Sequence, residues 1–471
     1  MNTMSEDSKT KQLKEKLFTA AKRGIVTASA DEIAKADEFC EGYKSFLDNS
    51  PVEREAVSYS LELAKANGFV EFEQDKKYSA GDKVYYVNRG KAIALAVIGK
   101  NGTKNGVRFA IAHIDSPRVD LKPNPLYEDN SLAYFKTHYY GGIKKYQWTV
   151  MPLALHGTVV KLDGTKVDIK VGVSDDDPCF CITDLLPHLA REQAAKTLGK
   201  AIEGEDLNVL IGSRPYATED EESELVKLNV MNILNERYGI TENDFLSAEL
   251  CLVPAQKARD VGFDRGLIGA YGHDDKVCAY PALMAALDCG VPECTCITYL
   301  TDKEETGSDG NTGMQSDFLR YFVYDLAKAD GEEGYRVLSK SKCLSADVNA
   351  AFDPIYAAAY EARNSSFINL GVIISKYTGH GGKYDTSDAS AEYMGEIRSM
   401  LEKNGVMWQV GELGKVDIGG GGTIAKYVAN MNVDVVDLGV PVLSMHAPFE
   451  LVSKLDVYEA YRAFSAFYNN L

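Results

Sequence analysis

Histidines and acidic residues stand at the ends of apolar segments along this chain. His113 and His446 are two of only seven histidines, and each closes an apolar run of strand character. Carboxylates are placed in the same way, after apolar strands or just before an apolar helix. These carboxylates are Asp274, Glu304, Glu305 and Asp347. Because ligands of α/β proteins bind at the carboxyl ends of strands, we expect these side chains to converge on one cleft.

A cluster of this kind requires a cation. Carboxylates that converge repel one another, and burial of an unpaired charge is costly unless a cation binds or the pKa rises. A mixture of imidazole and carboxylate suits zinc, manganese or cobalt better than calcium, which prefers oxygen ligands. Two histidines and three carboxylates are too many for one catalytic zinc with an open position. They suit two ions about 3.5–4 Å apart that share a carboxylate. We therefore predict two divalent metal ions, with zinc first and cobalt or manganese as alternatives.

The adjacent pair Glu304 and Glu305 indicates a division of labour. At a strand end the two side chains point in different directions. One can bind metal while the other accepts a proton from an attacking water, as a general base does. Asp115 follows His113 by two residues and shares its face of an extended chain, so it can accept a hydrogen bond from the far ring nitrogen and fix the tautomer. The alternative is that Asp115 caps the turn that follows it.

The surrounding segments predict an α/β fold, with a mixed sheet and helices on both of its faces. Residues 10–65 have apolar positions at helical spacing, and residues 82–100 are typical of a hairpin. Between 119 and 265 the pattern changes to β-runs, two of them joined by an Asp-Gly turn. Buried strands alternating with helical segments return after residue 266. We expect a discontinuous domain, 1–118 and 266–471, interrupted by a β-rich domain at 119–265.

Composition narrows the class of protein. Of 471 residues, 45% are hydrophobic and 25% charged, which is ordinary for a globular chain. The net charge of −18 disfavours nucleic acid as a partner, because phosphates would be repelled. Apolar runs do not approach the length of a membrane span, so a membrane is not an expected partner. The first residues lack an apolar signal core, and the nine cysteines are expected to be reduced thiols, so the expected location is cytoplasmic.

Several motifs, taken together and in order, resemble the aspartyl aminopeptidase family of dinuclear metallopeptidases. They are AHIDSPR at 112–118, HDDKV at 273–277, DKEETGS at 302–308, SADVNAAFDP at 345–354 and SMHAPFE at 444–450. The segments YYGGI at 139–143 and KYTG at 376–379 are also similar to the family. Each motif alone is weakly specific, but the ordered set spans nearly the whole chain.

The resemblance implies a role for each residue and an assembly for the chain. Asp274 would bridge the two metals, and Glu304 would be the general base. The other ligands would be His113, Glu305, Asp347 and His446. The family fold is an α/β metallopeptidase domain interrupted by a β-rich dimerisation domain. It forms a homo-oligomer, a tetrahedral dodecamer, and cleaves N-terminal Asp or Glu from peptides.

One departure from the family bears on the substrate. The family often has a stretch with two histidines, the second of which reaches a neighbouring subunit's site. The similar stretch here is LPHLARE at 186–192, in which His188 is kept and Glu192 stands in place of the second histidine. A glutamate there would repel an acidic substrate side chain. Lys376 and Tyr377 remain candidates for substrate binding, although Lys376 also fits a solvated strand end. The alternatives are an aminopeptidase of neutral or broad specificity, a metal-dependent amidase or deacylase, or a non-catalytic shell protein.

Overall fold

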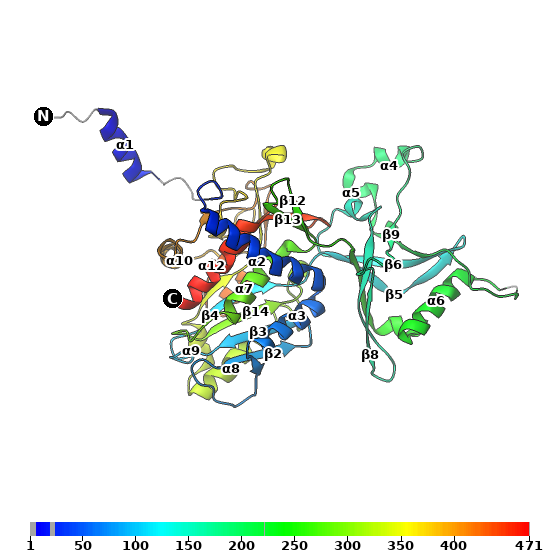
Figure 1. Cartoon of the computed structure of the whole chain (residues 1–471), viewed down its shortest axis with the longest axis horizontal. Helices are drawn as coiled ribbons and strands as arrows, with labels where there is room; N and C mark the ends of the chain where they lie inside the picture. Colours follow the sequence, from blue (N-terminus) through cyan, green and yellow to red (C-terminus); the bar gives the residue numbers. More distant parts are fainter. Residues whose placement is uncertain (1–5, 19–23, 221, 471) are drawn as a thin grey trace.

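The computed structural model describes residues 6–18, 24–220 and 222–470, and its largest sheet has nine strands. A second sheet, described below, forms a separate lobe on the right of Figure 1. In order across the nine-stranded sheet, the strands are β1 (Val70–Glu71), β2 (Lys83–Asn88), β3 (Ala92–Val97), β14 (Cys296–Thr301), β4 (Arg108–His113), β15 (Lys342–Ser345), β21 (Asp434–Gly439), β17 (Val372–Ser375) and β19 (Trp408–Val410). The sheet is mixed, because β14, β4, β15 and β21 run parallel while β2, β3 and β17 pair antiparallel.

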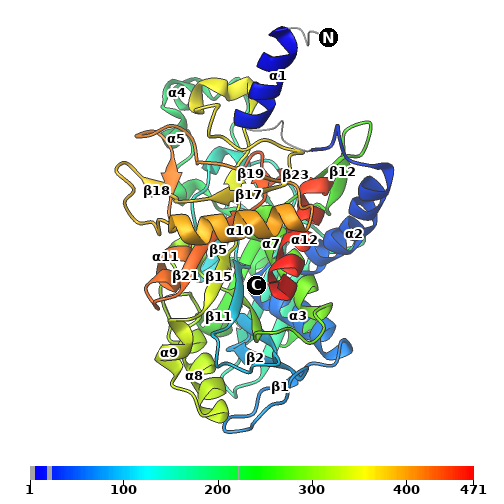
Figure 2. The ribbon, with the colours of Figure 1, turned by 90° about the vertical axis from the view of Figure 1, so that its left-hand side faces the viewer.

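Helices cover both faces of this sheet, as predicted. In β4, Ala110 and Ala112 face one core and Phe109 and Ile111 face the other, because side chains alternate along a strand. One face packs against α2 (Ala30–Asn49), α3 (Glu53–Ala66), α7 (His273–Leu287), α10 (Ala391–Lys403) and α12 (Lys454–Asn470). The other face packs against α8 (Phe318–Asp330), α9 (Gly334–Leu338) and α11 (Ala425–Ala429). Figure 2 shows the strands between the two helix layers, with α2, α3 and α12 on the right, α8, α9 and α11 on the left, and α10 in front.

The chain between Arg118 and Pro254 forms a seven-stranded antiparallel sheet with its own core. Its strands, in order, are β8 (Lys166–Val171), β7 (Leu153–Val160), β11 (Ala248–Pro254), β5 (Arg118–Asp129), β6 (Leu132–Tyr140), β10 (Val209–Gly212) and β9 (Cys181–Ile182). It carries α4 (Arg191–Ala195), α5 (Leu198–Ala201) and α6 (Leu225–Tyr238). We call this lobe the second sheet unit. The chain then returns through β12 (Arg259–Val261) and β13 (Leu267–Ala270), which pairs with β23 (Glu450–Ser453).

Two local expectations were wrong. His446 does not close a strand of the large sheet: β21 ends at Gly439, and only Pro441 and Val442 continue as β22, beside β16 (Asn349–Ala350). His446 lies in the turn before β23, with a positive φ of 63°. Glu304 is not in a strand either, because β14 ends at Thr301 and a short 3-10 helix, Glu304–Thr306, follows.

The ends of the chain and its thiols complete the fold. The expected N-terminal helix is present as α1 (Glu6–Leu17), and the end of the predicted segment, residues 19–23, lies outside the described residues. All nine cysteines are free, and all but Cys179 and Cys181 are buried. None of the helices in the described ranges is long and apolar enough to cross a membrane.

Candidate metal centre

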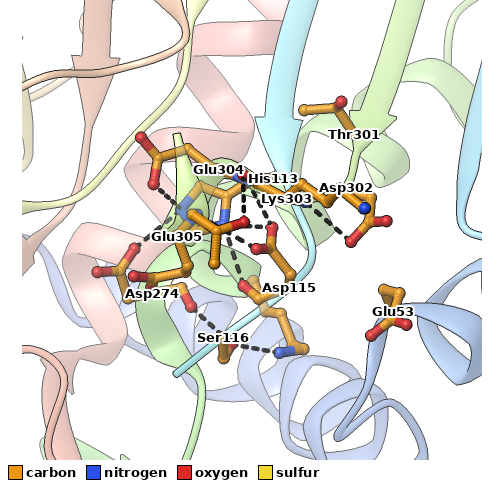
Figure 3. Close-up of polar contacts among 12 residues, drawn as sticks. Glu53, His113, Asp115, Ser116, Asp274, Thr301, Asp302, Lys303, Glu304 and Glu305 are labelled. Carbon is orange, nitrogen blue, oxygen red and sulfur yellow. Dashed lines mark hydrogen bonds and ion pairs between the residues drawn. The ribbon is translucent and has the colours of Figure 1, made fainter. Parts of the chain in front are cut away.

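Five segments far apart in sequence converge at one edge of the large sheet. His113 ends β4, Asp347 follows β15, and the turn with Glu304 and Glu305 follows β14. These three strands are parallel neighbours, so their carboxyl ends meet at the same edge. Asp274 at the start of α7 and His446 in the turn before β23 complete the group. We call these six residues the His–carboxylate cluster; Figure 3 shows most of it.

Asp274 lies between the two histidines. Its Oδ1 is 3.1 Å from Nε2 of His113, and its Oδ2 is 3.1 Å from Nε2 of His446. Each histidine donates from Nδ1 to a main-chain carbonyl oxygen, that of Asp115 at 3.0 Å and that of Gly142 at 2.8 Å. A carbonyl oxygen can only accept, so these bonds place the Nδ1 protons and leave both Nε2 atoms available as ligands.

The other carboxylates divide between the two histidines. Asp347 Oδ1 is 3.8 Å and Glu304 Oε2 is 4.0 Å from Nε2 of His113. Glu305 Oε2 is 3.5 Å from Nε2 of His446. Ligand atoms of His113, Glu304 and Asp347 lie within 4.8 Å of one another, and so do those of His113, Asp274 and Glu305. The cluster therefore offers donor groups on both sides of Asp274.

The electrostatics of the cluster fit bound cations. Burial raises the pKa of Glu304 to about 8, and the negative charge of Asp347 adds to this shift. Burial also raises the pKa of Glu305 well above its usual value, as does the charge of Asp274. One buried oxygen of Glu305, Oε1, has no hydrogen-bond partner. Crowded carboxylates with an unpartnered oxygen need positive charge, and mixed imidazole and carboxylate donors are those that zinc takes.

The pKa of Asp274 shifts in the opposite direction. Burial would raise the pKa of Asp274, but the hydrogen bonds and charges of His113 and His446 lower it below its usual range. Burial would likewise lower the pKa of His446, but Asp274 raises it to about 11. Asp274 is therefore the anionic centre around which the two imidazoles are arranged.

Asp115 organises the turn that carries the two glutamates. Its Oδ1 accepts from the N–H of Glu304 at 3.1 Å, and its Oδ2 accepts from the N–H of Glu305 at 3.2 Å (Figure 3). The hydroxyl of Tyr140 donates to the same Oδ2 at 2.8 Å. His113 is closer to the main-chain oxygen of Asp115 than to its carboxylate, where Nδ1 and Oδ1 are 3.4 Å apart. The hydrogen bond from His113 therefore goes to the main-chain oxygen of Asp115 and not, as expected, to its carboxylate, which chiefly holds the turn.

Sequence reasoning missed several residues that support the cluster. Tyr140 and Gly142 come from the second sheet unit, and the only signal for them was the segment YYGGI. Ser116 donates to the carbonyl oxygen of Asp274 at 2.8 Å, and the buried Lys276 donates to Ser116 Oγ at 2.7 Å. Both lie inside quoted motifs, AHIDSPR and HDDKV, but their types alone did not indicate a role.

The predicted substrate-binding residues do not contact the cluster. Lys376 is paired with Asp388, and the hydroxyl of Tyr377 donates to Glu412 at 2.5 Å. His188 is exposed and lies in the second sheet unit, just before α4 (Figure 1). Within the described residues of one chain, none of the three makes a hydrogen bond or ion pair with the cluster.

The mixed α/β sheet, with histidines and carboxylates at its carboxyl edge, defines a metal-dependent hydrolase. The family described as aminopeptidase I zinc metalloprotease (M18) matches residues 46–468. The chain belongs to this M18 family, which confirms the resemblance, and it is a zinc metalloaminopeptidase.

Bacterial relatives agree over nearly the whole chain. A protein of Clostridium acetobutylicum named "Probable M18 family aminopeptidase 1" is 50% identical, and the match covers 91% of this chain and 94% of that protein. The crystal structure of an M18 aminopeptidase from Thermotoga maritima has a TM-score of 0.92 at 44% identity, covering 96% of this chain and all of that one. The yeast mApe1 dodecamer shares the fold, with a TM-score of 0.74 at 21% identity over 93% of this chain and 97% of that one.

Proposed function

We propose that this protein uses two divalent metal ions to remove N-terminal residues from peptides, and that zinc is the first candidate for these ions. The observation that carries the proposal is the position of Asp274, whose two oxygens face the Nε2 atoms of two different histidines. His113 and Asp347 would hold one ion, and His446 and Glu305 the other. Asp274 would bridge them, which is the arrangement of two-metal hydrolases.

The side chains around the ions would carry out the proton transfers. Bound divalent ions polarise a carbonyl and lower the pKa of an attacking water. Glu304 would accept the proton of that water and return it to the leaving amine. Its pKa of about 8 in the absence of a metal charge reflects burial beside Asp347. Asp115 would keep Glu304 in place by accepting its N–H.

Glu304→Gln tests the assignment of the base. The amide preserves the shape of the side chain but cannot take up a proton, so we expect kcat to fall about 100-fold or more. Zinc content should equal that of the wild type. The matched control is Glu293→Gln, a change at an exposed glutamate that pairs with Lys100, which should leave both quantities unchanged. Retained hydrolysis in the Glu304 variant would exclude it as the base, and loss of zinc would make it a ligand.

We propose N-terminal aspartate and glutamate as the preferred substrates. Lys376 and Lys383 both contact the carboxylate of Asp388, and Lys383 lies over the ring of Tyr377, whose hydroxyl donates to Glu412. Either lysine could turn to an acidic substrate side chain, whereas Glu192 on α4 would oppose one if a neighbouring chain brought α4 near. Within one chain, Glu192 lies in the second sheet unit.

A panel of N-terminal aminoacyl amides tests this preference on the zinc-reconstituted protein. We expect kcat/KM for Asp and Glu to exceed that for Leu by about 10-fold or more, as one charge pair allows. Equal cleavage of Asp and Leu substrates would establish a broad aminopeptidase instead. N-acetylated versions serve as the control: their cleavage would indicate an amidase or deacylase, because an aminopeptidase needs a free α-amine.

We also propose a homo-oligomer, with a dodecamer as the first candidate, in a cytoplasmic location. The second sheet unit exposes Leu185, Leu186 and Leu189, which are 52%, 50% and 68% exposed. Neighbouring exposed apolar side chains mark contact surfaces between proteins. A cytoplasmic location agrees with nine free cysteines.

A further inference from the structure

Glu450 joins the two segments that carry Asp274 and His446. Its Oε1 accepts from the N–H of His446 at 2.7 Å, and its Oε2 accepts from the N–H of Asp274 at 3.1 Å. Glu450 is 1% exposed and stands at the first position of β23, where it pairs with Ala270 of β13. One carboxylate therefore spans main-chain groups 172 residues apart in sequence, 274 and 446.

Both segments need such an anchor. His446 and Ser444 have positive φ values of 63° and 58°, which L-residues keep only when the surroundings enforce them. Asp274 stands at the start of α7, where N–H groups have no partner within the helix and a negative charge is favourable. A single carboxylate satisfies both requirements and fixes the spacing between the two backbones.

We propose that Glu450 is a positioning residue that sets the distance between Asp274 and His446 and so tunes zinc affinity at the side of the centre held by His446. This inference rests on the proposed two-metal function. It assigns Glu450 no contact with zinc or substrate, because both of its oxygens are occupied by main-chain N–H groups. Groups that orient metal ligands in this way change affinity or activity by about 10–100-fold when they are altered.

The chain offers a matched control in Asp456. Its two oxygens also accept main-chain N–H groups, those of Asn369 and Gly371, each at 2.7 Å. It is completely buried, like Glu450, but neither of its partners belongs to the cluster. Asp456→Asn therefore removes an equivalent structural link without touching the backbone of a metal ligand.

The test uses the full chain, stripped of metal by a chelator and titrated with Zn²⁺ against a chromophoric chelator. In Glu450→Gln, the amide oxygen can still accept from one N–H, but the NH2 group can only donate, so the other N–H is left unpaired. We expect the affinity of one of the two zinc sites, assigned to the His446 side, to fall about 10-fold or more in this variant. Glu450→Asp keeps the charge but is one methylene shorter, so it should also bind zinc more weakly than the wild type. Asp456→Asn should lower the melting temperature and leave zinc affinity within about 2-fold.

Each other outcome has a distinct meaning. Wild-type affinity in both Glu450 variants would overturn the inference. Wild-type zinc affinity in Glu450→Asp alone would show that only the charge of Glu450 matters. Equal weakening of zinc binding in Asp456→Asn would show that general stability explains the effect. Either result would also overturn the inference. If Glu450→Gln does not fold, judged by circular dichroism, Glu450→Asp carries the measurement. A wild-type chain that binds fewer than two ions contradicts the two-metal proposal instead, and the variants still decide the role of Glu450 on the remaining ion.

Discussion

At the scale of single residues, the centre depends on carboxylates that are held by main-chain N–H groups. Asp115 accepts from Glu304 and Glu305, and Glu450 accepts from Asp274 and His446. Against the effect of burial, His113 lowers the pKa of Asp115, and hydrogen bonds from N–H groups to an ionised carboxylate are stronger than neutral ones. The ligand side chains are thus oriented through their own backbones, and their ligand atoms stay free for a cation.

Tyr140→Phe tests this orientation through Asp115. Loss of the hydroxyl leaves Oδ2 of Asp115 with the N–H of Glu305 alone, so the turn should be held less firmly. A hydrogen bond to a charged group contributes about 1.5–3 kcal/mol, and we expect kcat to fall about 10-fold with KM nearly unchanged. Tyr139→Phe, at the exposed neighbouring tyrosine, is the control and should leave kcat unchanged. A change confined to KM in the Tyr140 variant would place Tyr140 against the substrate instead.

At the scale of elements, the first turn of α3 connects the large sheet to the second sheet unit. Three consecutive residues of this turn each make an ion pair with a strand of that unit. The pairs are Glu53–Arg118, Arg54–Glu249 and Glu55–Lys170. The guanidinium of Arg118 also lies 4.3 Å from the ring centroid of Tyr140, which bonds to Asp115. The orientation of the second sheet unit is therefore linked to the turn that carries Glu304.

Glu53→Gln should weaken this link. Glu53 and Arg118 are largely buried, with 7% and 12% side-chain exposure, and the change removes one of the two carboxylates that pair with this guanidinium, the other being Asp120. Loss of a hydrogen bond between charged groups costs about 1.5–3 kcal/mol in the free energy of unfolding, which a denaturant titration would detect. The control is Lys35→Gln, which breaks the exposed pair with Asp31 and should not shift the midpoint. An unchanged midpoint for the Glu53 variant would show that the pair does not hold the two units together.

At the scale of the whole molecule, the second sheet unit serves two purposes. It supplies Tyr140 and the carbonyl group of Gly142 to the metal centre, and it exposes Leu185, Leu186 and Leu189. An exposed apolar segment in a unit that also shapes the site suggests that assembly and catalysis are connected.

Light scattering on the purified protein tests the assembly. A dodecamer has twelve times the chain mass of 51.6 kDa. The double change Leu186→Asp and Leu189→Asp should reduce this mass, because burying two carboxylates in an apolar contact is unfavourable. Circular dichroism should show that the variant remains folded. A wild type with the mass of one chain would contradict the proposed oligomer, and an unchanged mass in the variant would place the contact elsewhere.

Local patterns in the sequence indicated which strands are followed by histidine or carboxylate side chains, and therefore which types of metal donor they carry. The hairpin of β2 and β3, the end of β4 at His113 and the placement of helices on both faces followed from periodicity, because burial repeats at fixed spacing along a strand or helix. The ordered motifs then identified the family. These features depend on near neighbours, so the chain itself encodes them.

Only the tertiary structure decided how the donors face one another. It placed His446 in a turn and Glu304 in a 3-10 helix, and it turned one oxygen of Asp274 toward each histidine. It also brought in Gly142 and Glu450, since the bond from His446 to Gly142 joins residues 304 positions apart. Such contacts depend on how two sheets and a turn pack together, and the periodicity of a single segment carries no information on that packing.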